Sequence, residues 1–273
     1  MLKIEFILYI KMRIGLLLIN ILFITKSYCN TAIPDSSSEK LELFALGARP
    51  YWQLSRALKH DTCWPSSCVE NGKIVESANL KKWPVAAQGG CPDVGSSFPL
   101  YWVGKQCKDT EIRIGYDIFF KKDGFQPSGI YGHGYDWEQV IVIYNKHNNN
   151  WLRSGVYLSG HGGYTYYKWN ELNTVNENNI NVDGNNLDHP KIYPAWAKHS
   201  MFKEPKDGDT FFEALDAFDK NAFRKGSYQY FNNENELTQV IPNTELWNLV
   251  SNKDWNKASS SPNVVYAKLC NIK

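Results

Sequence analysis

The sequence predicts a mostly β protein, a single-domain β-sandwich with a few peripheral helices and long loops braced by disulfides. Aromatic residues make up 14% of the 273 residues, and aromatic side chains favour pleated sheet. Short segments with strand periodicity recur along the chain between long loops, which is the pattern of two packed sheets. Three of the six cysteines lie between residues 63 and 91, in a part without sustained periodicity. No internal repeat is visible, so one domain accounts for the chain.

The first part of the chain, residues 1–29, has the pattern of a secretory signal peptide, and residues 30–273 form the predicted mature domain. Basic residues precede an apolar run from Ile14 to Ile24. This run is well short of the ~20 residues that a spanning helix needs. Met12, directly before Arg13, is an alternative start of a more regular signal. We therefore expect a secreted, extracellular protein.

The mature domain is nearly neutral. Removal of residues 1–29 takes away four basic side chains and one acidic one, so the formal net charge falls from +2 to −1. This balance argues against a nucleic-acid partner, because phosphate neutralisation needs a basic surface. Cleavage after Cys29 leaves an odd number of cysteines, so one is a free thiol or pairs with another chain. An oxidising compartment favours disulfides over zinc for Cys63 and Cys68.

The N-terminal part of the mature domain predicts one helix followed by loops. Residues 35–38 form a polar helix start, and apolar residues follow at helical spacing until Gly47. From Trp52 to Trp102 the chain is rich in Pro, Gly, Ser and Cys. We expect long loops there, because such residues favour turns.

The middle of the chain predicts a series of strands. The clearest is residues 112–120, where apolar and polar or small residues alternate, and Lys121–Gly124 is expected to break it. A turn at His161–Gly163 separates two of the later strands. These further strands are Trp137–Tyr144, Val156–Leu158 and Tyr164–Trp169.

Three elements are predicted in the C-terminal part. The Asn-rich stretch Asn173–Asn186 is polar and predicts a loop. Thr244–Val250 has the pattern of a helix, and Asn263–Leu269 that of a strand.

Acidic side chains gather at one end of the predicted sheet. Asp136 and Glu138 are two residues apart, so on a strand they point the same way with α-carbons ~6.6 Å apart. Asp123 reaches the same rim if its strand pairs with theirs as a hairpin, and His133 lies beside them. Such carboxylates raise one another's pKa unless a cation is bound between them. We expect a divalent cation, Mg²⁺ or Ca²⁺, with His133 holding a bound water or ligand oxygen. Direct ligation by His133 would shift the choice toward Mn²⁺ or Zn²⁺.

The stretch GHGYDWE at residues 132–138 resembles the heptapeptide of the necrosis- and ethylene-inducing peptide-like proteins, a family secreted by plant-associated microbes. The resemblance extends in the family's order from about Leu43 to the C-terminal third. Its further blocks are CWPSS at 63–67, GGCPD at 89–93, FFKKDG at 119–124, DWEQVIVIY at 136–144, SGHGGY at 159–164 and HPKIYPAWAKHSMF at 189–202.

The resemblance implies a β-sandwich like that of actinoporins and some fungal lectins. It also implies a divalent cation at one end, and recognition of glycosylated inositol-phosphate sphingolipids on plant plasma membranes, followed by membrane damage without catalysis. The implied residues are Asp123, His133, Asp136 and Glu138 for the metal, and Cys63 with Cys91 for a disulfide. Candidate ligand or membrane contacts are Trp196 and His199, near the family's membrane-facing loops, and Tyr135 in the heptapeptide.

The chain departs from the family at two positions of the heptapeptide. Gly134 and Tyr135 stand where Arg and a second His are usual, so a basic residue and an imidazole are missing from the rim. Two alternatives stay open. One is a non-cytolytic, lectin-like member of the family. The other is a metal-assisted hydrolase in which Glu138 or Asp136 acts as general base and His133 as acid.

Overall fold

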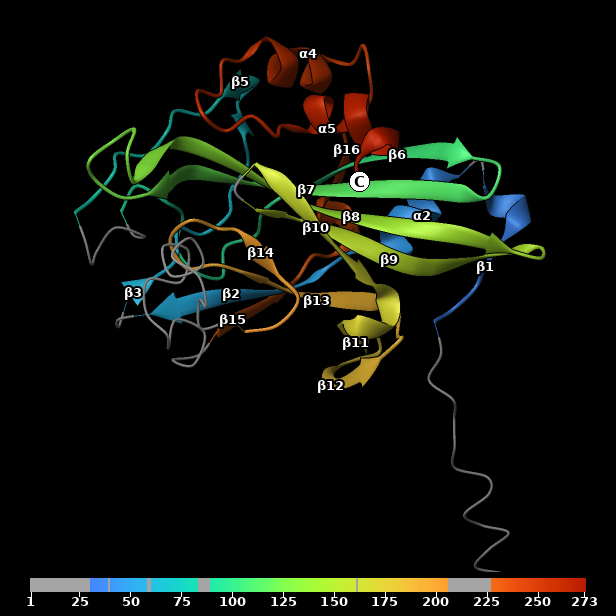
Figure 1. Ribbon diagram of the computed structural model, residues 1–273. Coiled ribbons are helices and arrows are strands. Elements are labelled where there is room, and N and C mark those ends of the chain that lie inside the picture. Colours follow the sequence, from blue (N-terminus) through green and yellow to red (C-terminus); the bar gives the residue numbers. More distant parts are fainter. Residues whose placement is uncertain (1–29, 39, 58–59, 83–88, 161, 206–226) are drawn as a thin grey trace, which may run out of the picture.

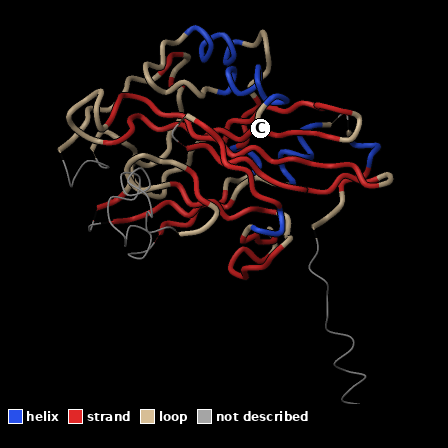
Figure 2. Tube along the Cα trace, in the orientation of Figure 1, coloured by secondary structure: helices blue, strands red, loops and turns tan. Residues whose placement is uncertain are grey.

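The computed structural model describes residues 30–38, 40–57, 60–82, 89–160, 162–205 and 227–273. Two seven-stranded sheets lie one over the other, with helices α4 and α5 on the outer side of the first (Figures 1 and 2). Among the described residues, no helix combines the length and apolar character that crossing a bilayer requires. The mostly β sandwich with few helices is confirmed. The predicted signal peptide lies outside the described residues, as does His161 of the predicted turn.

The first sheet is an antiparallel meander extended at both edges. Its strands are β1 (Ile33–Pro34), β6 (Leu100–Lys108), β7 (Glu111–Gly124), β8 (Gly132–His147), β9 (Asn150–Gly160), β10 (Gly163–Lys168) and β16 (Leu237–Gln239). The register between β7 and β8 is the same from Glu111 opposite Asn145 to Gly124 opposite Gly132, and the pairing skips only Lys121 and Tyr135. This long hairpin positions the acidic residues at its far end.

The second sheet mixes local hairpins with long-range pairing. Its strands are β2 (Tyr51–Ala57), β3 (His60–Asp61), β11 (Asn173–Asn176), β12 (Asn179–Asn185), β13 (His189–Pro194), β14 (Met201–Phe202) and β15 (Ser227–Phe231). A separate hairpin joins β4 (Val69–Glu70) and β5 (Lys73–Ile74). The helices are η1 (Asp35–Ser37), α2 (Leu41–Gly47), η3 (Trp169–Glu171), η4 (Glu234–Glu236), α4 (Glu245–Asn252), α5 (Pro262–Lys268) and η5 (Leu269–Asn271).

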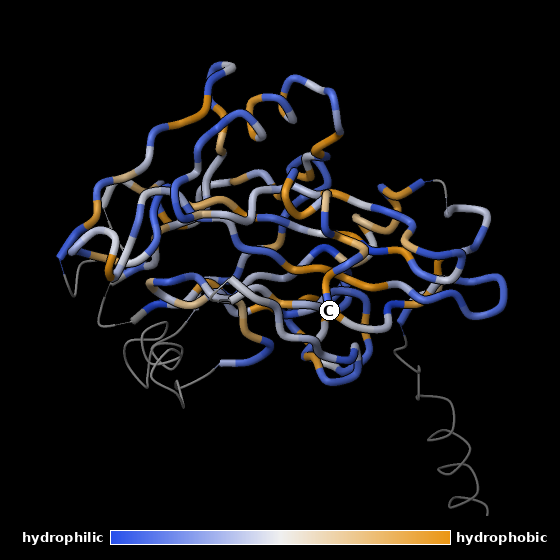
Figure 3. Tube along the Cα trace, turned by 45° about the horizontal axis from the view of Figure 1, so that its top comes forward, coloured by the Kyte–Doolittle hydropathy of each residue, from blue (hydrophilic) through white to orange (hydrophobic). Residues whose placement is uncertain are grey.

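Two apolar layers follow from the alternation of side chains along β7 and β8. One face packs against the second sheet, where Trp52 and Ile192 meet Ile114 and Val142. The other face packs against the C-terminal segment, whose Trp255 joins the layer. Apolar segments therefore run along the strands and hydrophilic ones mark the turns (Figure 3).

Several elements match the sequence pattern. The predicted helix is α2, the alternating strand is β7, and the later strands correspond to β8, β9 and β10, except that Trp169 belongs to η3. The second predicted helix is α4, where Thr244 caps the N-terminus by accepting a hydrogen bond from the backbone N–H of Trp247.

Four local predictions are wrong. The predicted loop region after Trp52 contains β2, a central strand with both faces buried, so it shows no alternation. Lys121–Gly124 does not break β7, because pairing with β8 continues to Gly124. Asn173–Asn186 folds into the β11–β12 hairpin. Asn263–Leu269 is largely helix α5.

The incorrect prediction of a strand at Asn263–Leu269 has a simple cause. Val264 and Val265 favour a strand locally, but Pro262 occupies the start of a helix, where its missing N–H costs nothing. Val265 and Leu269, four residues apart, are both buried, which is helical spacing. The periodicity therefore outweighs the β propensity of two residues.

Two disulfides brace the fold. Cys63 pairs with Cys91, as the resemblance implies, and Cys107 in β6 pairs with Cys270 in η5. Cys68 is the free thiol among the cysteines that the structure describes, and burial raises its pKa to about 12. Cys68 is therefore an inert packing residue.

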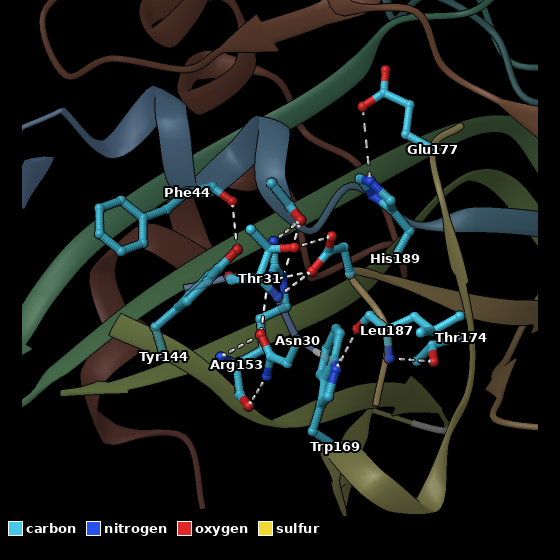
Figure 4. Close-up of polar contacts among 12 residues, drawn as sticks. Asn30, Thr31, Phe44, Tyr144, Arg153, Trp169, Thr174, Glu177, Leu187 and His189 are labelled. Atoms are coloured by element: carbon cyan, nitrogen blue, oxygen red, sulfur yellow. Dashed lines mark hydrogen bonds and ion pairs between the residues drawn. The ribbon is translucent and has the colours of Figure 1, made fainter. Parts of the chain in front are cut away.

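The buried Arg153 ties the N-terminal segment to the sandwich (Figure 4). Its guanidinium donates to the side chain of Asn30 at 2.8 Å, to the carbonyl of Thr31 at 2.9 Å and to the carboxylate of Asp188 at 2.9 Å. It also donates to the Gly47 carbonyl at the end of α2. One side chain thus satisfies acceptors from three segments, which are residues 30–31, the end of α2 and the residue before β13.

Replacement of Arg153 by methionine should destabilise the protein, because it leaves buried acceptors and a carboxylate without their donor. We expect a loss of about 3–5 kcal/mol, a fall in Tm of roughly 6–20 °C for a chain of this size. Thermal unfolding followed by circular dichroism measures it.

Arg56→Met is the matched control. Arg56 pairs with Asp61 at 3.4 Å, but its side chain is 47% exposed. Its loss should cost less than about 1 kcal/mol. Equal destabilisation by the two variants would contradict the role assigned to Arg153.

Candidate functional site

The four residues predicted as metal ligands line one pocket at the end of the β7–β8 hairpin. Asp123 comes from the end of β7, and His133, Asp136 and Glu138 come from β8. The pocket has a volume of about 310 Å³. Asp123 and Asp136 are buried, whereas His133 and Glu138 are partly exposed.

A local irregularity brings the two aspartates together. Asp123 pairs with His133, three positions from Asp136, so strict alternation would place the aspartates on opposite faces. Tyr135 lies in the left-handed region with φ of 59° and interrupts this alternation. The carboxylates of Asp123 and Asp136 consequently reach the same buried point.

His199 completes the buried cluster from the loop between β13 and β14. Its Nδ1 lies 3.0 Å from Oδ2 of Asp136 and 3.6 Å from Oδ1 of Asp123. Its ring stacks on Phe120 with centroids 3.8 Å apart. One ligand atom from each of Asp123, Asp136 and His199 lies within 4.8 Å of the others, a spacing that can hold a metal ion.

The loop that carries His199 is fixed by backbone hydrogen bonds. The N–H of Ala195 donates to the carbonyl of Ser200 at 2.9 Å, and the N–H of Gly124 donates to the carbonyl of Ala197 at 2.7 Å. The second contact joins the loop directly to the end of β7. The cluster is therefore held by both sheets.

The charge balance of this cluster is unfavourable. Burial, followed by the negative charge of Asp136, raises the pKa of Asp123 to about 7, although the ammonium of Lys198 opposes the shift. Burial lowers the pKa of His199 to about 4, so its ring is neutral at pH 7. The imidazole that touches both carboxylates thus does not neutralise them, and ionisation of both carboxyl groups favours an additional positive charge.

His133 presents its Nε2 to the pocket. Its Nδ1 lies 2.9 Å from the carbonyl oxygen of Tyr135, and a carbonyl only accepts, so Nδ1 carries the proton. The other ring nitrogen, Nε2, lies 3.4 Å from Oδ2 of Asp123. A backbone carbonyl that fixes the tautomer is a common way to orient a metal-binding imidazole.

Glu138 lies at the pocket wall beside the buried cluster. Its Oε2 accepts a hydrogen bond from the hydroxyl of Ser159 on β9. The same hydroxyl oxygen accepts from the backbone N–H of Gln139 at 2.8 Å. Ser159 therefore fixes the Glu138 carboxylate with an additional donor.

The residues present fit a hard divalent cation. Buried Oδ1 of Asp123 has no hydrogen-bond partner among the described residues, and its other oxygen contacts Lys198 at 3.1 Å. Carboxylate oxygens are the ligands that Mg²⁺ and Ca²⁺ prefer. Asp123 and Asp136 would hold the ion, with His133, Glu138 and His199 next to it.

The candidate membrane contacts lie in the interior. Trp196 is 0% exposed, His199 1% and Tyr135 6%. His199 belongs to the carboxylate cluster, and Tyr135 packs against Trp255, with ring centroids 5.3 Å apart. None of these three side chains presents its surface to a bilayer in this conformation.

Sequence reasoning missed two lysines of the pocket. Lys198 and Lys257 both line it, from segments far apart in the chain. Lys198 directly precedes His199, so the block that suggested His199 contained a signal for it. No sequence signal pointed to Lys257.

These features define a β-sandwich protein with an acidic, cation-compatible pocket at one end of its sheets. Residues 53–234 match the family described as Necrosis inducing protein (NPP1), and the chain belongs to this family. Among curated proteins, no sequence matches significantly.

Solved structures of similar proteins share low sequence identity with the chain. The non-toxic HaNLP3 protein is 18% identical, with 85% of this chain and 89% of that chain covered and a TM-score of 0.48. NLPPya in complex with glucosamine is 20% identical, with 78% and 80% covered and a TM-score of 0.47. Necrosis and Ethylene inducing Protein 2, from the causal agent of cocoa's Witches Broom disease, is 19% identical, with 81% and 93% covered and a TM-score of 0.43.

Asp136→Ala should abolish binding of a divalent cation while the fold is retained. At about a hundredfold excess over Kd, a bound cation adds about 2.7 kcal/mol of stability, a rise in Tm of roughly 5–10 °C. We expect this rise, and the calorimetric heat with Mg²⁺ or Ca²⁺, in the wild type only. Unchanged binding in Asp136→Ala would reject the site.

The raised pKa of Asp123 predicts a pH-dependent stability in chelator. The protonated carboxyl stabilises the folded state fully below its ordinary pKa of 3.8, and this contribution is lost as pH rises through about 7. Asp123→Asn should therefore gain in Tm relative to the wild type between pH 4 and 8, by on the order of 5 °C at pH 8.

His199 contributes to stability in the opposite sense, because its pKa is lowered in the folded state. Its contribution is fully present above pH 6.5 and is lost as pH falls through about 4. Because Asp123 also raises the pKa of His199, the difference between wild type and Asp123→Asn measures the aspartate alone only above pH 6.5, where the imidazole is neutral in both proteins. A difference in Tm that does not change with pH would contradict the assignment.

Proposed function

We propose that this protein is a secreted, cation-dependent binder of glycosylated inositol-phosphate sphingolipid head groups on plant plasma membranes, and that it causes membrane damage and cell death. Membership of the necrosis-inducing protein family supports the biological role. The observation that carries the binding mode is the buried convergence of Asp123 and Asp136.

The pocket geometry suits binding of a polyhydroxylated head group. A hard cation such as Mg²⁺ or Ca²⁺ supplies open coordination positions to which hydroxyl and phosphate oxygens bind. Glu138 and His133 are partly exposed next to the buried aspartates, so they can accept hydrogen bonds from sugar hydroxyls. Asp123, Asp136 and His199 are held on both sheets, which keeps the site preorganised.

Binding rather than catalysis accounts for this arrangement. A ligand held by oxygen coordination and hydrogen bonds needs no nucleophile, and Ser159 is engaged with Glu138 and the backbone of Gln139. The disulfides fit an oxidising compartment, in agreement with secretion.

A non-lytic, lectin-like member of the family is the second candidate. The burial of Trp196, Tyr135 and His199 favours it, because the expected membrane-contacting side chains are not on the surface. Both candidates use the same pocket, and they differ in whether the membrane leaks once the head group is bound.

Leakage from vesicles separates the candidates. With Mg²⁺ or Ca²⁺, the mature protein should release dye from vesicles that contain glycosylated inositol-phosphate sphingolipid. Chelator or Asp136→Ala should lower the rate at least tenfold, because the head group then loses its anchor. Fluorescence dequenching measures release.

The other outcomes each identify a different protein. Cation-dependent binding to the vesicles without leakage would identify the lectin-like member. Release of a free sugar or inositol phosphate from labelled lipid would instead identify a hydrolase. Leakage that is equal with and without chelator would contradict the proposed cation dependence.

A further inference from the structure

Two lysines form a basic wall of the pocket, in addition to its acidic strands. Lys198 comes from the loop between β13 and β14, and Lys257 comes from the segment after α4. Lys198 lies 3.1 Å from Oδ2 of Asp123 and so compensates that carboxylate. Lys257 has a different role, because no carboxylate of the described residues forms an ion pair with it. Its ammonium donates at 2.6 Å to the carbonyl of Gly129.

Lys257 is held in place although its side chain is exposed. It lies between two buried residues, Trp255 at 6% exposure and Ala258 at 4%. The N–H of Ala258 donates to the carbonyl of Trp255 at 3.1 Å and closes a turn around the lysine. Together with the contact to Gly129 at the tip of the β7–β8 hairpin, this turn fixes the lysine at the mouth of the pocket.

The anchor of this turn contacts the strand that carries the acidic residues. Trp255 packs against Trp137, with ring centroids 5.4 Å apart, and against Phe119 at 5.6 Å. Trp137 lies between Asp136 and Glu138 in the sequence. The distance between the basic and acidic walls is therefore set by aromatic packing rather than by a flexible loop.

The charges of the loaded pocket do not cancel. Lys198, Lys257 and a divalent cation together exceed the three carboxylates of Asp123, Asp136 and Glu138 by one positive charge. A neutral polyol leaves this charge uncompensated, whereas a ligand with one anionic group balances it. A partly enclosed pocket strengthens the preference, since its charges are less screened than on an open surface.

We propose that Lys257, with Lys198, forms an anion subsite beside the cation, so that the pocket selects sugars or inositols that carry a phosphate or a carboxylate. The inference rests on the proposed function, because it assumes that a cation occupies the acidic wall. It adds a determinant of specificity: the lysines hold the acidic group, and the acidic wall holds hydroxyls of the same ligand through the ion.

Calorimetry with matched ligand pairs tests the subsite. The mature protein, saturated with Mg²⁺ or Ca²⁺, is titrated with inositol and inositol monophosphate, and with glucose and glucuronate. The first pair tests a phosphate and the second a carboxylate, each against its neutral parent. We expect the anionic member of at least one pair to bind roughly tenfold tighter, the effect of about one favourable ion pair.

Lys257→Gln should reduce this preference to threefold or less. Its cation affinity should hold or rise slightly, because one neighbouring positive charge is removed. Lys253→Gln is the matched control, since it removes a nearby lysine whose ammonium lies over the ring of Tyr135 and outside the pocket. This control should keep the full preference.

Several outcomes overturn the inference. One is equal affinity for the anionic and the neutral ligand of both pairs in the wild type. Another is an undiminished preference for the anionic ligand in Lys257→Gln. Both results leave the proposed function intact if the cation binds. Absence of cation binding contradicts the proposed function itself. In that case the same titrations in chelator test the anion subsite. The subsite is rejected if the anionic ligands again bind no tighter than the neutral ones.

Discussion

The site depends on two carboxylates that the fold buries beside one another. A buried carboxylate loses the hydration that stabilises its charge, and a second one a few ångströms away adds repulsion. Asp123 and Asp136 are 4% and 5% exposed, and the imidazole that contacts both is itself buried and neutral. The fold thus keeps negative charge without a compensating positive charge at this point, and a bound cation would supply that charge. Such uncompensated charge destabilises the protein without a cation and favours cation binding.

The two aspartates stay close together because distant parts of the chain hold them in place. β7 and β8 bring the aspartates to one end of the first sheet, and the loop between β13 and β14 brings Lys198 and His199 from the second. The N–H of Gly124 joins that loop to the end of β7. The cluster can therefore form only when the sandwich is assembled, and Arg153 and the disulfides help to hold that assembly.

The sequence predicted the acidic wall better than the rest of the site. Alternation gave β7 and the shared direction of Asp136 and Glu138, because strand period is a local property. The convergence of Asp123 with Asp136 depends on the positive φ of Tyr135. The sequence does not predict a positive φ at a residue other than glycine. The place of His199 depended on packing between sheets, and that of Lys257 on the anchoring of Trp255. Similarly, β2 forms by pairing with the distant strands β13 and β15. The strands β11 and β12 pair locally, but their Asn-rich residues carry little strand signal.

The two departures from the family heptapeptide have a structural basis in this chain. A Cβ at Gly134 would meet Oγ of Ser77 at 2.8 Å, so the usual arginine cannot stand there unless the segment around Ser77 moves. The ring of Tyr135 fills the outer layer against Trp255 and lies beneath the ammonium of Lys253. Both positions thus serve packing, and the positive charges at the pocket come from Lys198 and Lys257 instead. Because Trp255 contacts both Tyr135 and Trp137, the residue that replaces the second histidine also supports the turn that holds Lys257. The basic wall and the altered heptapeptide are consequently parts of one packing arrangement.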